Sequence, residues 1–195
     1  MKPEGLLLSD VTTPIIDRGS YVVDVGWWYL EQTLQSFANA EGLDLDPDFQ
    51  RAHVWSQSQQ ERYVEYIIRG GYAGKEIYWN STTWNGAHNT PVQIVDGKQR
   101  LEAVRKFLRG EIQAFGHFYN EYSARAFRLH HARFTFYVNG LKTRREVLQW
   151  YLDINRGGTQ HTEEEIEKVR RLLAVEMKLH IGLMGELSAS GPPGL

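Results

Sequence analysis

The spacing of apolar and polar residues along the chain predicts a mixture of short helices and strands. Residues 27–39 repeat apolar side chains at helical intervals, and residues 56–69 do the same after a capping box formed by Ser56 and Gln59. The side chains expected to be buried in these two helices are Trp28, Leu30, Leu34, Phe37, Tyr63, Val64, Ile67 and Ile68.

Strand patterns lie between the helical ones. The predicted strands are residues 21–23, 75–79, 91–95 and 133–138, the last followed by a turn at Asn139 and Gly140. The apolar run 91–95 ends at Asp96 and Gly97, where a helical pattern begins at once and continues to Gly110. Helices and strands in this mixed order predict an α+β fold with a small mixed sheet flanked by helices.

The C-terminal part of the chain is predicted to be helical. Residues 143–154 have a helical pattern, and a second capping box of Thr162 and Glu165 begins a longer helix. Its expected inward-facing residues are Ile166, Val169, Leu173 and Met177. Residues 188–195 are small or proline and are expected to form a mobile tail, so residues 1–187 are expected to form a single domain.

Composition narrows the possible functions. The chain has 195 residues, 22 of them basic and 24 acidic, and the net charge of −2 excludes binding to nucleic acid through overall charge alone. It has no cysteine, which excludes disulfides, thiolate metal sites and cysteine nucleophiles. No apolar run approaches the ~18 residues that a membrane span needs, so we expect a cytoplasmic protein that contacts no membrane.

The junction at Asp96 and Gly97 is the strongest candidate site in the sequence. A strand that passes into a helix through glycine exposes backbone N–H groups at the positive end of the helix dipole, which suits an anion. Asp96, Lys98, Gln99 and Arg100 add a carboxylate, an amide and two cations. This combination favours a nucleotide phosphate with its metal ion, although a capped helix with solvent-facing cations has the same pattern.

Other sites are less favoured by the sequence. The acidic run of Asp44, Asp46 and Asp48 lacks the glycine and glutamate of a calcium loop, so a solvated turn is the preferred interpretation. A P-loop fails because Val92 stands where its first glycine would be. His130 and His131 precede Asn139 as in an HNH nuclease core, but Leu148 occupies the place of a third histidine.

Four segments together resemble the GmrSD N-terminal domain family, within the ParB/sulfiredoxin-like superfamily. Residues 96–100 read Asp-Gly-Lys-Gln-Arg and are similar to the family's DGQQR motif, from which Lys98 departs. Residues 47–55 are similar to its upstream Y/F-Q-R…V-W element, and residues 56–69 match the helix that follows that element. Residues 155–159 resemble its Asn-x-x-Gly-Thr loop, so the likeness extends from about Leu43 to about Arg171.

The resemblance implies a ParB/sulfiredoxin-like core and a nucleotide-binding, Mg²⁺-dependent NTPase, without sulfiredoxin chemistry because the chain has no thiol. The implied catalytic residues are Asp96, Gln99 and Arg100, with Asp96 as the metal ligand. The implied phosphate-binding residues are Gln50, Arg51, Gly97, Lys98, Arg100, Asn155, Gly157, Gly158 and Thr159.

The biological setting allows three hypotheses. The first is the regulatory half of a modification-dependent restriction system, whose partner would be a separate nuclease subunit. The second is a ParB-like protein that binds or nicks DNA, and the third is a non-catalytic phage or host interaction protein that retains the fold. A homo-oligomer is compatible with all three. NTP turnover would separate the first from the third, and salt-sensitive DNA binding would indicate the second.

Overall fold

The computed structural model describes residues 21–40, 42–50, 54–82, 91–123, 131–155 and 163–189. The strands are β1 (Tyr21–Gly26), β2 (Leu43–Asp44), β3 (Glu76–Asn80), β4 (Val92–Asp96) and β5 (Arg133–Asn139). The α-helices are α2 (Trp27–Ala40), α3 (Gln57–Ile68), α4 (Lys98–Leu108), α5 (Arg144–Asn155) and α6 (Glu163–Ala189). The predicted α+β class is confirmed.

The strands form one mixed sheet in the order β1-β5-β3-β4-β2. β5 is antiparallel to β1 and parallel to β3, whereas β4 is antiparallel to β3 and parallel to the two-residue β2. The register shifts between Tyr78 and Trp79, so that Tyr78 pairs with Asp96 and Trp79 with Ile94. This bulge brings the last residue of β4 level with the middle of β3.

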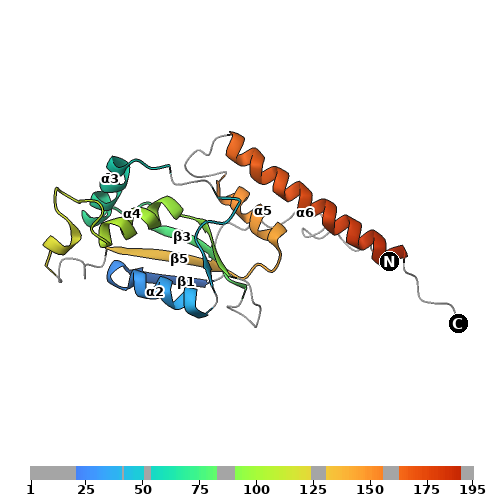
Figure 1. The fold of residues 1–195 in the computed structure, drawn as a ribbon, viewed down its shortest axis with the longest axis horizontal. Coiled ribbons are helices and arrows are strands. Elements are labelled where there is room, and N and C mark those ends of the chain that lie inside the picture. Colours follow the sequence, from blue (N-terminus) through green and yellow to red (C-terminus); the bar gives the residue numbers. More distant parts are fainter. Residues whose placement is uncertain are drawn as a thin grey trace, which may run out of the picture.

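One face of the sheet is covered by α2, α3 and α4 (Figure 1). Side chains from these helices and from alternate strand positions form the larger core; among its fully buried members are Trp27, Leu30, Ile67, Ile77, Trp79, Ile94, Phe107, Phe134 and Phe136. The capping box predicted at the start of α3 is confirmed, since Ser56 and Gln59 exchange side-chain and backbone hydrogen bonds. The helix therefore begins where its sequence signal lies.

The other face of the sheet carries a smaller core made mainly with α5 and α6. Its buried members are Phe49, Val95, Val147, Leu148, Trp150, Tyr151, Leu152 and Val169. α5 has 12 residues and α6 has 27, so at 1.5 Å per residue α6 is longer by about 22 Å. The second half of α6 therefore extends away from the rest of the molecule (Figure 1).

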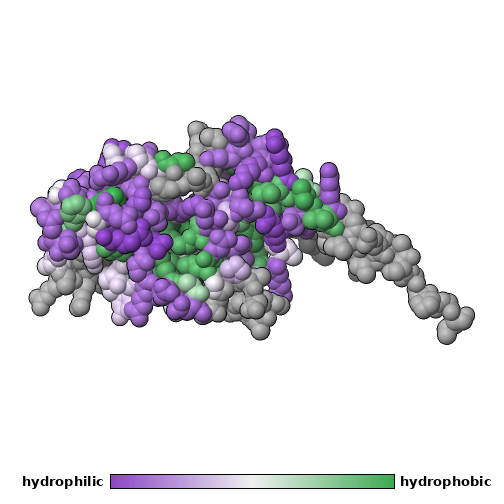
Figure 2. Space-filling model, in the orientation of Figure 1, coloured by the Kyte–Doolittle hydropathy of each residue, from purple (hydrophilic) through white to green (hydrophobic). Residues whose placement is uncertain are grey.

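Two predicted core positions are wrong. Trp28 is 45% exposed, whereas Trp27 is buried, because Trp27 precedes Leu30 by three positions and lies on its face of α2. Met177 is 48% exposed although its neighbour Glu176 pairs with Arg144 of α5, so it lies on a side of α6 that α5 does not cover, and Figure 2 shows hydrophobic residues at the surface of α6. α6 also includes Ser188 and Ala189, which were expected in the tail.

Apart from the two-residue β2, where the sequence predicted no strand, the remaining elements agree with the sequence patterns to within a few residues. β1 extends the predicted strand at residues 21–23, and α5 begins one residue after the predicted start at 143. Residues 83–90, which follow β3, and the capping residue Thr162 lie outside the described residues. Among the residues that are described, no helix is both long and apolar enough to span a bilayer.

Candidate functional site

The predicted strand–helix junction is confirmed at the end of β4. Asp96 is the last residue of this strand, Gly97 has φ +99°, and α4 begins at Lys98. A Cβ on residue 97 would lie 2.6 Å from Ile77 Cδ1 and 3.2 Å from the Glu76 carbonyl oxygen. Glycine is therefore required here both for its positive φ and for the close approach of β3. The first turn of α4, with its positive dipole end, faces this junction.

Asp96 and Arg100 form an ion pair across the junction. Arg100 Nη2 donates to Asp96 Oδ2 at 2.7 Å, and the two side chains are only 20% and 31% exposed. The Nε atom of Arg100 is buried and has no hydrogen-bond partner in the described part of the chain. A guanidinium held in this way by a single carboxylate retains donors for a further acceptor such as a phosphate oxygen.

Two tyrosines that the sequence analysis did not assign to the site, Tyr63 and Tyr78, are influenced by the charges of this ion pair. Burial raises the pKa of Tyr63, whose hydroxyl donates to the Gly74 carbonyl at 2.6 Å, and burial also raises the pKa of Tyr78. The positive charge of Arg100 lowers the pKa of both tyrosines and so opposes the effect of burial. The negative charge of Glu76 raises both pKa values, and Asp96 also raises the pKa of Tyr78. Both phenols therefore lie within electrostatic range of the guanidinium and stay protonated at neutral pH.

Two predicted site residues hold neighbouring backbone in place. Gln99 Oε1 accepts hydrogen bonds from the N–H groups of Val54, at 2.9 Å, and Trp55, at 3.2 Å. Gln50 Nε2 donates to the carbonyl oxygens of Val95, at 2.6 Å, and Ile94, at 3.3 Å. Both glutamines are over nine-tenths buried. They join the segment around residues 47–55 to the β4–α4 junction.

Lys98 lies on the other side of α4 from Arg100. Residues separated by two positions in a helix point in directions about 200° apart around its axis. The Lys98 ammonium accordingly forms an ion pair with Asp46. It lines a surface cavity of about 320 Å³ between α4 and the segment after β2. The cavity is lined by Leu45, Asp46, Ile94, Lys98, Leu101, Glu102, Arg105 and Lys106. Lys98 and Arg100 therefore do not point into one pocket.

The acidic run before residue 49 connects parts of the fold. Asp44 accepts a hydrogen bond from the Asp46 backbone, and Asp48 forms a 2.7 Å ion pair with Arg144 of α5. No group of three or more acidic or histidine side chains placed to hold a metal ion occurs among the described residues. Asp46 and Asp48 are thus paired with cations of α4 and α5, and the choice of a solvated turn over a calcium loop stays a prediction.

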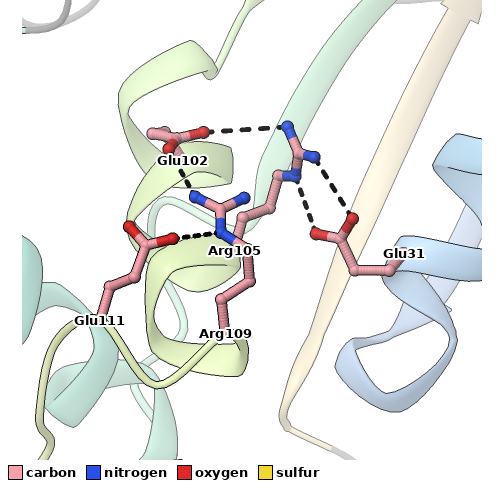
Figure 3. A network of polar contacts seen from close by, with 5 residues as sticks. All are labelled: Glu31, Glu102, Arg105, Arg109 and Glu111. Carbon is pink, nitrogen blue, oxygen red and sulfur yellow. Dashed lines mark hydrogen bonds and ion pairs between the residues drawn. The ribbon is translucent and has the colours of Figure 1, made fainter.

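The basic end of α4 is neutralised by acidic side chains (Figure 3). Arg105 pairs with Glu31 of α2 at 2.8 Å and with Glu102 at 3.8 Å, and Arg109 pairs with Glu102 and Glu111. This network joins α2, α4 and the segment after α4. Cations already matched by carboxylates attract a polyanion weakly, so this surface is a poor candidate for DNA binding.

Comparison with known protein families identifies the family to which most of the chain corresponds. The model of the GmrSD restriction endonuclease N-terminal domain matches residues 31–174. The chain belongs to this family. No curated protein and no solved structure matched it. The match to the GmrSD N-terminal domain extends from within α2 into α6, so it includes the whole β4–α4 junction.

Several residues that the GmrSD resemblance implicated lie beyond what the structure describes. Arg51, Gly157, Gly158 and Thr159 are outside the described residues, as is His130. Asn155 is the last residue of α5, and its Nδ2 donates to the Tyr151 carbonyl at 2.7 Å. The grouping of Arg51 and the 155–159 loop with Asp96 stays a prediction.

Proposed function

We propose that this GmrSD N-terminal domain binds a nucleoside triphosphate with Mg²⁺ at the β4–α4 junction and hydrolyses it. The observation that supports this most is the Asp96–Arg100 ion pair beside the N-terminus of α4, at a junction where residue 97 must be glycine. The junction places a partly buried guanidinium and carboxylate beside the positive end of the α4 dipole. Phosphoryl transfer needs mainly such positioning and charge neutralisation.

Each group has a chemical role in the proposed site. Arg100 would leave Asp96 to donate to phosphate oxygens, using its Nη atoms and its unpartnered Nε. The carboxylate of Asp96 offers the hard oxygen ligands that Mg²⁺ prefers. Mg²⁺, when bound, would neutralise phosphate charge. Water would attack the terminal phosphorus, and the bond to the bridging oxygen would break to give a diphosphate and inorganic phosphate.

The family description names a restriction endonuclease. Because acidic side chains neutralise the cations of Figure 3, we assign DNA cleavage to a partner nuclease subunit or module. The present domain would then act as the nucleotide-dependent regulator of that nuclease.

Calorimetric titration of the purified protein with ATP, GTP, CTP and UTP, with and without Mg²⁺, tests the proposal. Arg100→Ala removes a charge-assisted contact worth roughly 1.5–3 kcal/mol, or ~10- to 150-fold in affinity. Asp96→Asn should retain Mg²⁺-free binding, since it releases Arg100, but lose the Mg²⁺-dependent gain and hydrolysis. Arg170→Ala, an exposed arginine of α6, is the matched control and should bind as wild type does. Failure of wild type to bind any nucleotide at millimolar concentration, or equal binding by all variants, would refute the proposal.

A further inference from the structure

Four residues from four adjacent strands form a row that begins at the candidate site. Asp96 of β4 pairs with Tyr78 of β3, Tyr78 with Tyr137 of β5, and Tyr137 with Val22 of β1. Residues directly opposite one another in a sheet direct their side chains to the same face. The carboxylate that the proposed function assigns to Mg²⁺ is therefore at one end of a row whose remaining members are two tyrosines and a valine.

The two tyrosines of the row are stacked. Their ring centroids are 5.2 Å apart with an interplanar angle of 16°, and Trp150 of α5 meets Tyr78 edge-on at 6.1 Å. Tyr78 thus lies between Tyr137 and α5. Tyr137 is only half-buried, and Val22, its neighbour on the side away from Tyr78, is 51% exposed. The row therefore ends in an aromatic ring beside an apolar, accessible position.

We infer that the ring of Tyr137, together with its cross-strand neighbour Val22, is the platform on which the base of the nucleotide stacks. This inference rests on the proposed function. Strands are spaced by about 4.8 Å, so Val22 is on the order of 14 Å from Asp96 along the row. An extended nucleoside triphosphate spans this distance with its phosphates at Asp96 and Arg100 and its base at Tyr137. The flat, offset packing of Tyr78 against Tyr137 fixes the ring plane that a base would meet.

Polar groups border the platform in the next row of the sheet. Thr135 pairs with Glu76 and with Asp24, and its hydroxyl donates to Asp24 Oδ1 at 2.6 Å. Arg133 approaches the other oxygen of Asp24 at 3.3 Å. A carboxylate held in this way accepts hydrogen bonds from ribose hydroxyls in other nucleotide sites. Stacking tolerates any base, so the platform itself suits several nucleotides and polar neighbours would select among them.

The test compares nucleotides with inorganic tripolyphosphate, which has the phosphates but no base. Titrations in Mg²⁺ use ATP, GTP and tripolyphosphate against wild type, Tyr137→Leu, Tyr137→Phe and the control Tyr29→Leu, an exposed tyrosine of α2. Base stacking on one aromatic ring corresponds to about 5- to 150-fold in affinity. Tyr137→Leu should weaken ATP and GTP binding by that factor and leave tripolyphosphate binding unchanged. Tyr137→Phe and Tyr29→Leu should bind as wild type does.

Equal affinity of wild type and Tyr137→Leu for ATP and GTP, or equal weakening for tripolyphosphate, would overturn the platform. Failure of wild type to bind nucleotides and tripolyphosphate alike would overturn the proposed function instead. Val22→Trp provides a second variant at a position that is 51% exposed, so the larger side chain should leave the fold intact. Its indole would cover the position proposed for the base, so nucleotide affinity should fall while tripolyphosphate affinity stays constant. Unchanged nucleotide affinity in this variant would also contradict the platform.

Discussion

Replacement of Gln99 by alanine should destabilise the domain. The Gln99 side chain is 8% exposed, and its Oε1 atom is the acceptor for the N–H groups of Val54 and Trp55. Alanine leaves both part-buried donors without this acceptor, at about 1–1.5 kcal/mol each, so we expect a loss of about 2–3 kcal/mol in the free energy of unfolding. For a chain of this size that corresponds to a fall of about 4–12 °C in Tm.

Gln99→Glu separates this positioning role from a catalytic one. Glutamate keeps a side-chain oxygen in the same place as an acceptor, and its charge is favourable in the first turn of α4. It loses the amide N–H₂ that a residue aligning a nucleophilic water would use. If Gln99 acts by holding residues 54 and 55, Gln99→Glu should retain more of the free energy of unfolding than Gln99→Ala, although burial of its charge offsets part of the gain.

Urea unfolding followed by tryptophan fluorescence measures both variants. Gln57→Ala is the matched control, because Gln57 is an exposed glutamine of α3 whose side chain contacts only Glu61 among the described hydrogen bonds. It should change the free energy of unfolding by no more than about 0.5 kcal/mol. An unfolding free energy of Gln99→Ala equal to that of wild type would refute the positioning role, and loss of NTP turnover by a stable Gln99→Ala would support the catalytic one.

Two further predictions concern stability. Gly97→Ala and Gly110→Ala each force alanine to a positive φ, which costs about 1–2 kcal/mol of unfolding free energy. In urea unfolding, Gly97→Ala should lose about 1–3 kcal/mol more than Gly110→Ala, because only the Cβ at residue 97 meets Ile77. Equal losses in the two variants would contradict this prediction. Hydrogen bonds from the Thr143 backbone, above all, lower the pKa of Glu146, so its contribution is present above about pH 4.3 and is lost as pH falls through the lower folded-state pKa. Wild type should therefore lose more stability between pH 7 and pH 3 than Glu146→Gln does.

Local signals in the sequence were sufficient for the helices, for the longer strands and for the junction. The change from a strand to a helical pattern at Asp96 and Gly97 depends on neighbouring residues only, and β4 and α4 meet there as predicted. The same holds for the capping box of Ser56 and Gln59. The orientation of Lys98 could also have been derived from the sequence, since residues i and i+2 of a helix, here Lys98 and Arg100, lie on nearly opposite sides. The sequence interpretation placed Lys98 with Arg100 because it followed the motif and not the helix geometry.

The surroundings of the junction depend on contacts between distant segments. Tyr78 and Tyr137 are 59 positions apart in the sequence, and they stack only because β3 and β5 pair in parallel with a particular register. The bulge beside Tyr78 then brings Asp96 level with them. No local pattern encodes this register, so the aromatic part of the candidate site was missed although its polar part was found. Trp28 was misplaced for a related reason, since the register of α2 on the sheet is set by packing of Trp27.

The Asp96–Arg100 pair makes metal and phosphate binding interdependent in the proposed site. Without ligands, each charge satisfies the other at 2.7 Å in a half-buried environment. A phosphate that binds Arg100 leaves Asp96 without its cation, and a Mg²⁺ ion that binds Asp96 leaves Arg100 without its anion. Binding of either ligand alone therefore leaves a partly buried charge unpaired, which lowers the affinity for that ligand. Binding of both ligands satisfies both side chains. Linkage then requires that Mg²⁺ strengthens nucleotide binding by the same factor by which nucleotide strengthens Mg²⁺ binding, and that this factor decreases in Asp96→Asn.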